Sequence, residues 1–235
     1  MDFFAISHKG SYRKRNEDRF LAKKISNGSL LLAVADGMGG EAGGELAAQI
    51  VVDTLAQYNP NAGQPEGELS RLIERAGDII LQEIEKKPEF KGMGTTAVAA
   101  LILGMTVHWI NVGDSRLYLF RDGILTQISK DHSFLQSFLD QGEMTLEEVR
   151  SHPLRNVLDQ CVGCPDCNPD KNSFHLKHGD ILLLSSDGLH KYVSSGQITE
   201  VLKSQSSLED KARALLELAL ATGGRDNITI VLATV

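Results

Sequence analysis

Acidic side chains recur at the ends of the apolar, strand-like segments of this sequence. Two such runs, "LLAVADGMGG" and "ILLLSSDGLH", end in Asp-Gly, and similar junctions occur in "NVGDSR", "GGRDNITIV" and "RKRNEDRF". The acids at these junctions are Glu17, Asp18, Asp36, Asp114, Asp187 and Asp226. A single Asp-Gly is common turn chemistry, whereas this repetition along one chain indicates a shared site.

A shared site of this kind needs a cation. Two carboxylates about 4 Å apart repel each other by roughly 4 kcal/mol at an effective dielectric constant near 20. Oxygen ligands without paired histidines select hard ions, so we expect magnesium or manganese rather than zinc.

A nucleotide site is the alternative interpretation of the glycine-rich loop after Asp36. Gly37, Gly39 and Ala42 fit the permissive dinucleotide pattern of two glycines and a small residue between a strand and a helix. However, the charge of Asp36 would face the pyrophosphate, and the acidic residue about twenty positions later, Asp53, falls inside a predicted helix. No Gly-Lys-Ser/Thr follows, which excludes a Walker loop. The carboxylate interpretation is therefore preferred.

Apolar alternation predicts a chain dominated by strands, with helices between some of them. The predicted strands cover residues 3–7, 19–25, 30–35, 95–103, 106–112, 116–120, 173–177, 180–186 and 227–235. Helical periodicity covers residues 42–57, 68–86 and 208–221. Short turns such as "FRDGIL" indicate antiparallel pairing. This pattern predicts packed sheets covered by helices, not a doubly wound parallel sheet.

Composition narrows the function classes. The chain has 235 residues, a net charge of −7 and no clustered basic face, which argues against nucleic-acid binding. No apolar stretch reaches the roughly 18 residues of a membrane span, and the N-terminus shows no secretory signal. We expect a soluble, cytoplasmic monomer with one domain over residues 1–235.

Residues 133–172 lack the regular alternation of the rest of the chain. Two short helices are predicted at its start, followed by the aperiodic "CVGCPDCNPDKN". We interpret this segment as a mobile excursion, either a surface loop or a lid.

The excursion contains the three cysteines of the chain, Cys161, Cys164 and Cys167. Their spacing allows a zinc site if His175 or His178 supplies a fourth ligand. A redox-sensitive set of thiols, or a spacing without function, is the preferred interpretation, and a permanent disulfide is not expected in a reducing cytoplasm.

Eight motifs together resemble the metal-dependent serine/threonine protein phosphatases of type 2C, in their bacterial form. They are "RKRNEDRF", "ADGMGG", "GTTAV", "NVGDSRLYLFRDG", "DHS", "HPLRNVL", "SSDGL" and "RDNITIVL", and they occur in the family's order over nearly the whole chain. The resemblance implies an α+β fold, a four-layer α-β-β-α sandwich with two mainly antiparallel central sheets and a pair of divalent metals at one end. Residues 133–172 correspond to the family's flap.

The resemblance also implies roles for individual residues. Asp36 would bridge two Mn²⁺ or Mg²⁺ ions, and the carbonyl of Gly37 would bind one of them. Asp187 and Asp226 would complete the first metal site, and Asp114 would share a third, weaker metal with Asp187. Glu17 and Asp18 would hold metal-bound water. Arg13 would bind the substrate phosphate. Asn227 would support the site without binding metal.

The implied reaction is hydrolysis of phosphoserine and phosphothreonine in proteins by a water or hydroxide that bridges the two ions, in opposition to a cognate serine/threonine kinase. The Cys-x5-Arg loop of thiol phosphatases is absent from the sequence. Met38 stands where a histidine often follows Asp-Gly in eukaryotic members, so we expect a metal-bound water to serve as general acid. His132 and His152 are expected to be structural, and Trp109 to be core.

Two other functions remain open at this level. One is a metal-binding regulatory domain on the same fold that senses a partner without turnover, although Asp36, Asp187 and Asp226 are all retained. The other is hydrolysis of a small phosphoester.

Overall fold

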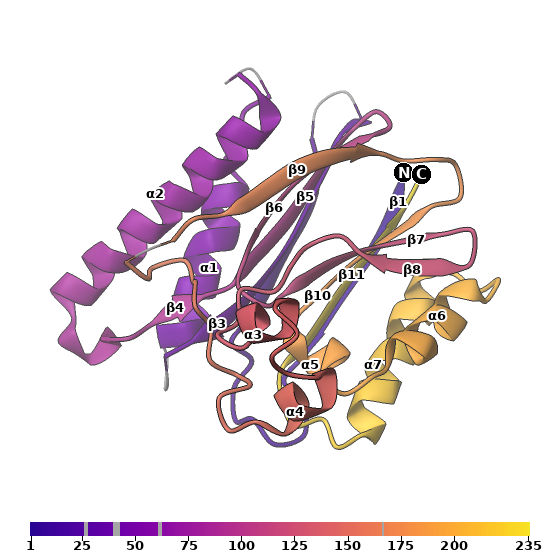
Figure 1. The fold of residues 1–235 in the computed structure, drawn as a ribbon. Coiled ribbons are helices and arrows are strands. Elements are labelled where there is room, and N and C mark those ends of the chain that lie inside the picture. The colour runs from indigo at the N-terminus through magenta and orange to yellow at the C-terminus, as the bar shows by residue number, and fades with distance from the viewer. Residues whose placement is uncertain (26–27, 40–42, 61–62, 166) are drawn as a thin grey trace.

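The computed structural model describes residues 1–25, 28–39, 43–60, 63–165 and 167–235. Two antiparallel sheets pack face to face, and helices cover both outer faces (Figure 1). The predicted α+β fold with two antiparallel sheets between helices is therefore confirmed. The start of the helix predicted at residue 42 lies outside the described residues.

The first sheet has five strands in the order β1-β11-β10-β7-β8. Its strands are β1 (Asp2–His8), β7 (Arg116–Arg121), β8 (Ile124–Gln127), β10 (Ile181–Ser185) and β11 (Ile228–Thr234). The β7–β8 hairpin turns at Asp122 and Gly123, whose φ angles of 52° and 78° match the two-residue turn that antiparallel hairpins favour. The sequence predicted the turn but not the short β8 strand.

The second sheet has six strands, in the order β2-β3-β5-β6-β9 with β4 paired to β3. Its strands are β2 (Asp18–Lys24), β3 (Leu30–Met38), β4 (Gly94–Thr95), β5 (Ala97–Leu103), β6 (Thr106–Val112) and β9 (Asp170–His175). The single strand predicted over residues 95–103 is thus divided in two, and the division falls at Thr96.

Helices α1 (Gly43–Leu55) and α2 (Pro65–Lys86) cover the second sheet, and a short 3-10 turn (Pro88–Phe90) follows α2. Leu69, Leu72, Ile73, Ala76 and Ile80 recur at three- and four-residue spacing along α2 and are fully buried. Pro65 occupies the first turn, where its missing N–H costs nothing.

The first sheet is covered by α5 (Asp187–His190), α6 (Ser195–Lys203) and α7 (Leu208–Ala221) (Figure 1). Ser207 accepts a hydrogen bond from the Asp210 amide at the start of α7, at the spacing that predicted this helix. A capping box of Ser194 and Gln197 begins α6. The sequence analysis missed α5 and α6 because each is too short to show a clear period.

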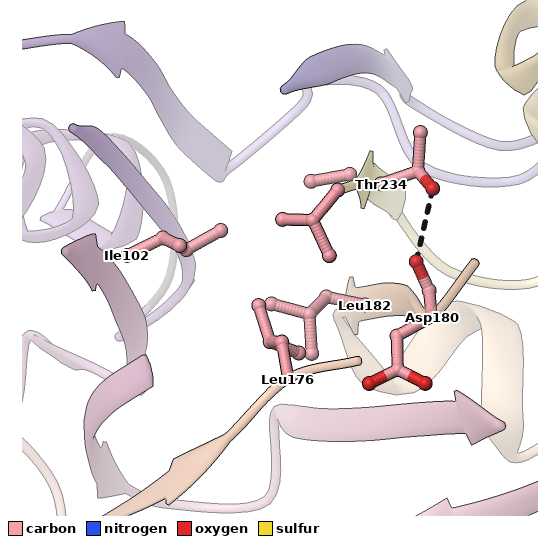
Figure 2. A pocket seen from close by; sticks show the side chains of 7 residues that line it. Ile102, Leu176, Asp180, Leu182 and Thr234 are labelled. Atoms are coloured by element: carbon pink, nitrogen blue, oxygen red, sulfur yellow. Dashed lines mark hydrogen bonds between the residues drawn. The ribbon is translucent and has the colours of Figure 1, made fainter. Parts of the chain in front are cut away.

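Three separate hydrophobic clusters correspond to the three interfaces between the four layers. Leu31, Ala33 and Ala35 of β3 face the helices, while Leu30 and Leu32 face the other sheet. Trp109 belongs to the cluster between the sheets, as predicted. At the far end of this interface, Ile102, Leu176 and Leu182 line a hollow that leaves no volume open to water (Figure 2).

The excursion over residues 133–172 contains α3 (Gln136–Asp140) and α4 (Leu146–Ser151), near the two predicted short helices. Its later part is anchored. Val162 is fully buried in the cluster beneath α1 and α2, and it pairs with Thr95 through two backbone hydrogen bonds of 2.8 and 3.1 Å. The sequence analysis predicted a mobile excursion over residues 133–172, and this prediction extends too far at its C-terminal end because Val162 is anchored to the second sheet.

Across the described residues, no helix is both long and apolar enough to pass through a membrane.

Candidate active site

A cleft of about 250 Å³ opens at one end of the two sheets. Every predicted site residue except Asp18 lines it directly, and Asp18 pairs in register with Asp36 on the neighbouring strand. The charged residues of the lining are Arg13, Glu17, Asp36, Asp114, Asp187, Lys191 and Asp226. The structure therefore brings together acids that lie up to 209 positions apart in the sequence (17 to 226).

Strand alternation places Asp36 and Asp18 between the sheets. Leu30, Leu32 and Val34 of β3 face the other sheet, and the two-residue period continues that face to Asp36. Asp18 faces the same side as Ala22, which packs in the cluster between the sheets. The interface thus changes from apolar to acidic at its end.

The backbone of Asp36 is fixed by two threonines. Its N–H donates to Thr96 Oγ1 at 2.9 Å, and its carbonyl accepts from the Thr96 amide at 2.9 Å and from Thr95 Oγ1 at 2.9 Å. One backbone bond and two bonds from threonine hydroxyl groups thus hold Asp36 at the point where the strand predicted over 95–103 divides. The carboxylate of Asp36 is thereby carried on a rigid support.

Gly37 is required by close packing of the chain. A Cβ on Gly37 would lie 2.0 Å from the carbonyl oxygen of Gly44 and 2.8 Å from that of Glu17. The start of α1 therefore touches the backbone of β3 directly after Asp36, and only glycine permits that approach.

The other sheet supplies Asp187 and Asp226. Asp187 begins α5 directly after β10, and Gly188 packs against Asn227, where a Cβ would lie 1.9 Å from the Asn227 carbonyl oxygen. Asn227 donates to the carbonyls of Lys9 and Arg15, both at 2.9 Å, and accepts from the Glu17 amide at 2.8 Å. Asn227 therefore binds the N-terminal loop to the start of β11.

Glu17 in the cleft lining and Asp18 behind it both have incomplete hydrogen bonding. Asp18 is 1% exposed, and its Oδ2 accepts from Ser186 Oγ at 2.7 Å. Its Oδ1 and the Oε1 of Glu17 are buried without a partner among the described residues. Burial raises the pKa of Glu17, and it raises the pKa of Asp18 to about 7 against the opposing effect of hydrogen bonds from Thr229 and Ser186.

The cleft carboxylates also raise each other's pKa. Burial raises the pKa of Asp36 well above its ordinary value, and the negative charges of Asp18 and Asp187 add to this effect. Burial raises the pKa of Asp187 to about 6, although Lys191 opposes the shift. Bound cations would hold such a cluster ionised at neutral pH, which is the first sign that it fits a metal.

The donor set suits hard divalent cations, because carboxylate and carbonyl oxygens line the cleft and, among the residues that the structure describes, no histidine or cysteine does. The buried, unpartnered oxygens of Glu17 and Asp18 point to the same fit. Among the described residues, no three His, Cys, Asp or Glu side chains already form a closed metal cage.

Two basic side chains lie against these acids. Arg13 Nη2 donates to Asp226 Oδ2 at 2.9 Å, and half of the Arg13 side chain remains exposed. Lys191 Nζ lies between Asp187 and Asp114, at 2.6 and 2.9 Å. The sequence analysis missed Lys191, although its position four residues after Asp187 was a usable signal.

The excursion borders the cleft on one side. Asn156 and Leu158 line it, and Lys191 Nζ donates to Asn156 Oδ1 at 3.2 Å. His132 is buried, with Nδ1 3.4 Å from the Gly113 amide and Nε2 3.2 Å from Asp170 Oδ2. It is thus a structural residue away from the cleft lining.

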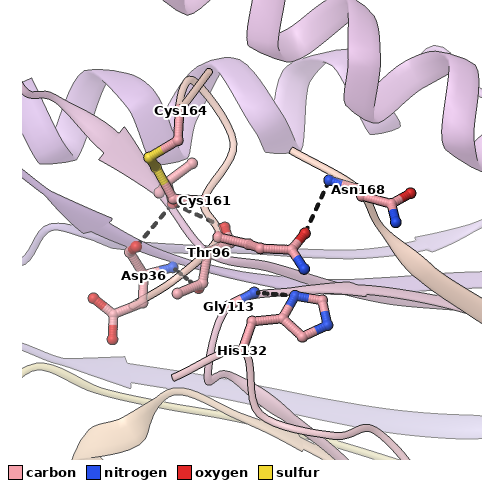
Figure 3. The surroundings of a disulfide bond; sticks show 9 residues. Asp36, Thr96, Gly113, His132, Cys161, Cys164 and Asn168 are labelled. Atoms are coloured by element: carbon pink, nitrogen blue, oxygen red, sulfur yellow. Dashed lines mark hydrogen bonds between the residues drawn. A yellow bond between two sulfur atoms is a disulfide. The ribbon is translucent and has the colours of Figure 1, made fainter. Parts of the chain in front are cut away.

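Cys161 and Cys164 form a disulfide, which the sequence analysis did not expect. The pair lies near Thr96 and Asp36 (Figure 3), and Cys161 is 1% exposed. Cys167 is the free cysteine, and burial raises the pKa of its thiol to about 11. Because two of the three sulfurs are bonded to each other, they are not available as ligands for the zinc site that the sequence analysis considered as an alternative.

Comparison with known proteins agrees with this geometry. The protein phosphatase 2C family model matches residues 8–228. Serine/threonine protein phosphatase PstP of Mycobacterium tuberculosis is 41% identical over 237 residues, which cover 99% of this chain. The chain belongs to the bacterial protein phosphatase 2C family. It spans 45% of the length of that curated relative.

Solved structures of this phosphatase 2C family superpose over the whole chain. The crystal structure of Mycobacterium tuberculosis PstP has a TM-score of 0.92 at 38% identity and covers 100% of this chain and 98% of its own. A second structure, the PstP catalytic domain in complex with two manganese ions, has a TM-score of 0.89 at 36% identity, with coverages of 99% and 97%.

Proposed function

We propose that this phosphatase 2C chain hydrolyses phosphoserine and phosphothreonine in proteins with two Mn²⁺ or Mg²⁺ ions in its cleft, and so opposes a serine/threonine kinase. The observation that carries the proposal is the meeting of carboxylates from both sheets in one cleft, beside a half-exposed arginine. The manganese-bound PstP structure supports the choice of metal.

The ligands of the two ions would be Asp36, the carbonyl of Gly37, Asp187 and Asp226. Glu17 and Asp18 would hold water around the ions through their buried, unpartnered oxygens. When bound, the ions would lower the pKa of a water molecule so that it loses a proton and can attack phosphorus, and their positive charge would stabilise the transition state.

Arg13 binds and orients the substrate phosphate. Its guanidinium carries a planar fork of donors that matches two phosphate oxygens. The side chain is half exposed at the rim of the cleft and is tied to the described structure by one contact with Asp226. A phosphate arriving from solvent can therefore reach the guanidinium without displacing any buried group.

The proton for the leaving serine or threonine alkoxide comes from water. Met38 lines the cleft at the position after Asp-Gly and offers no proton. The pKa of His190 lies well below its ordinary value because the side chain is buried, and the charges of Arg116 and Lys191 lower it further. That imidazole is consequently neutral near pH 7 and a poor acid.

The test is hydrolysis of a phosphothreonine peptide and of p-nitrophenyl phosphate by the purified chain with Mn²⁺ or Mg²⁺. We expect activity that excess EDTA removes and that Asp36→Asn lowers by about 10²-fold or more. Exposed Lys14→Ala is the matched control and should keep full activity. Turnover that persists in EDTA, or in the folded Asp36→Asn variant, would contradict the proposal.

A further inference from the structure

Lys191 places a positive charge where the family resemblance implies a third metal ion. Its Nζ lies 2.6 Å from Asp187 Oδ2 and 2.9 Å from Asp114 Oδ2, the two carboxylates that such an ion would share. We propose that the Lys191 ammonium replaces this third divalent cation, so that the chain works with two ions only. The inference rests on the proposed function.

The ammonium is fully satisfied in this position. A lysine has three N–H donors, and Nζ meets three acceptors, Asp187 Oδ2, Asp114 Oδ2 and Asn156 Oδ1, the last at 3.2 Å. The three acceptors come from α5, from the loop after β6 and from the excursion. An ion in the same place would have to displace all three bonds.

The lysine is tethered next to its partners. It follows directly after α5, and its amide donates to the Asp187 carbonyl at 3.0 Å, one helical turn back. The side chain therefore stays at a high effective concentration beside Asp187, whereas an ion from solvent must compete at its bulk concentration. Only 27% of the side chain is exposed.

The charge of the cleft is compatible with two divalent ions. Six carboxylates, including Asp18 behind the cleft, against the two basic side chains Arg13 and Lys191 leave four negative charges when all are ionised. Two divalent cations balance that excess. A third would have to bind beside an ammonium that already neutralises one of its two carboxylates.

A consequence concerns the excursion. Because Lys191 also binds Asn156, the ammonium connects Asp114 and Asp187 to the segment that borders the cleft. That connection is present at any metal concentration. The lysine is thus a positioning residue, and the excursion should keep its place against the cleft without a weakly bound ion.

Counting bound manganese by equilibrium dialysis tests the inference without turnover. We expect wild type to bind two Mn²⁺ at millimolar metal, which is the number of manganese ions in the related PstP catalytic-domain structure. Lys191→Met keeps much of the shape but removes the charge and should gain a further, weaker ion. Adding Asp114→Asn should remove that ion again. Lys191→Arg should stay at two, as should Lys203→Met, which alters only the exposed pair with Glu200.

Three results overturn the inference. The first is a third ion bound by wild type, and the second is a folded Lys191→Met variant that gains no ion. The third is a rise at millimolar Mn²⁺ in the acylation of Lys191 by an N-hydroxysuccinimide ester, read by mass spectrometry against exposed Lys203, which would mean that an ion displaces the ammonium. Failure of the proposed function would give a different result, because the two tightly bound ions would then be missing from every variant. The inference about Lys191 would then be rejected as well.

Discussion

Arg13 Nη2 donates to Asp226 Oδ2 across 2.9 Å, although 213 positions separate the two residues. The pair connects the exposed phosphate-binding candidate to a metal-ligand candidate. The hydrogen bond to Asp226 is also the main cause of the raised pKa of Arg13.

Arg13→Ala should lower kcat/KM for p-nitrophenyl phosphate by about 10²-fold, because the phosphate loses a charged, two-pronged donor. Arg13→Lys should recover only part of the loss, since a lysine cannot reproduce the fork. The Mn²⁺ concentration that gives half-maximal activity should not increase, because removing a cation frees Asp226. If the metal requirement rises sharply instead, Arg13 serves to hold Asp226 rather than the substrate.

Asp18→Asn should change how the stability of the metal-free protein depends on pH. The carboxyl of Asp18 has an ordinary pKa of 3.8 and a folded value of about 7, so the folded state holds the proton more tightly. Its stabilising contribution is complete below about pH 4 and is lost as pH rises through about 7. The free energy of unfolding of wild type should therefore fall relative to Asp18→Asn over this range.

The difference between these two proteins reports Asp18 together with its effect on Asp36, whose pKa the charge of Asp18 raises. Buried His190 acts in the opposite direction, because its lowered pKa makes stability rise as the pH increases toward its ordinary value of 6.5, but it is common to both proteins. Urea unfolding followed by circular dichroism with EDTA present gives the two curves. Parallel curves between about pH 4 and about pH 7 would show that Asp18 does not carry the raised pKa.

Gly37→Ala should destabilise the protein by about 3 kcal/mol or more, because the new methyl group would collide with the Gly44 carbonyl oxygen. Gly67→Ala is the matched control, since a Cβ there meets nothing within 4 Å and lies in α2. That variant should be more stable than wild type by about 0.5–1 kcal/mol. Equal melting temperatures for the two variants would contradict the close approach.

Cys164→Ser should lower the free energy of unfolding by about 2 kcal/mol, as expected for loss of a disulfide that closes a very short loop. A thiol assay under denaturing, non-reducing conditions should find one free thiol per chain, that of Cys167. Cys167→Ser should leave the disulfide and the stability nearly unchanged. Finding all three thiols free without added reductant would refute the pairing.

Much of the site could be predicted from the sequence because the same alternation that buries β3 also carries Asp36 to the end of the sheet. The Asp-Gly junctions and the motif order were sufficient to predict a common cleft for Asp36, Asp187 and Asp226. Contacts between side chains from distant segments could not be obtained in this way. The three-way contact of Lys191 and the division of a strand at Thr96 depend on packing that no local pattern encodes.

Short and irregular elements were the other features that could not be predicted from the sequence. Helix α5 has four residues, and β8 lies at a sheet edge with mostly exposed side chains, so neither shows a measurable period. Val162 lies in a stretch without alternation and is nevertheless buried, because its two backbone bonds to Thr95 hold it against the second sheet. Such anchoring is a tertiary effect.

The division of the carboxylates between the two sheets has a mechanical consequence. Asp18 and Asp36 are carried by the second sheet, whereas Asp187 and Asp226 lie next to strands of the first sheet. The distances between the candidate metal ligands therefore depend on how the two sheets are aligned. A small shift of one sheet against the other would disrupt the metal site even if every strand kept its hydrogen bonds. We therefore expect heat or pressure to abolish the activity before the protein unfolds.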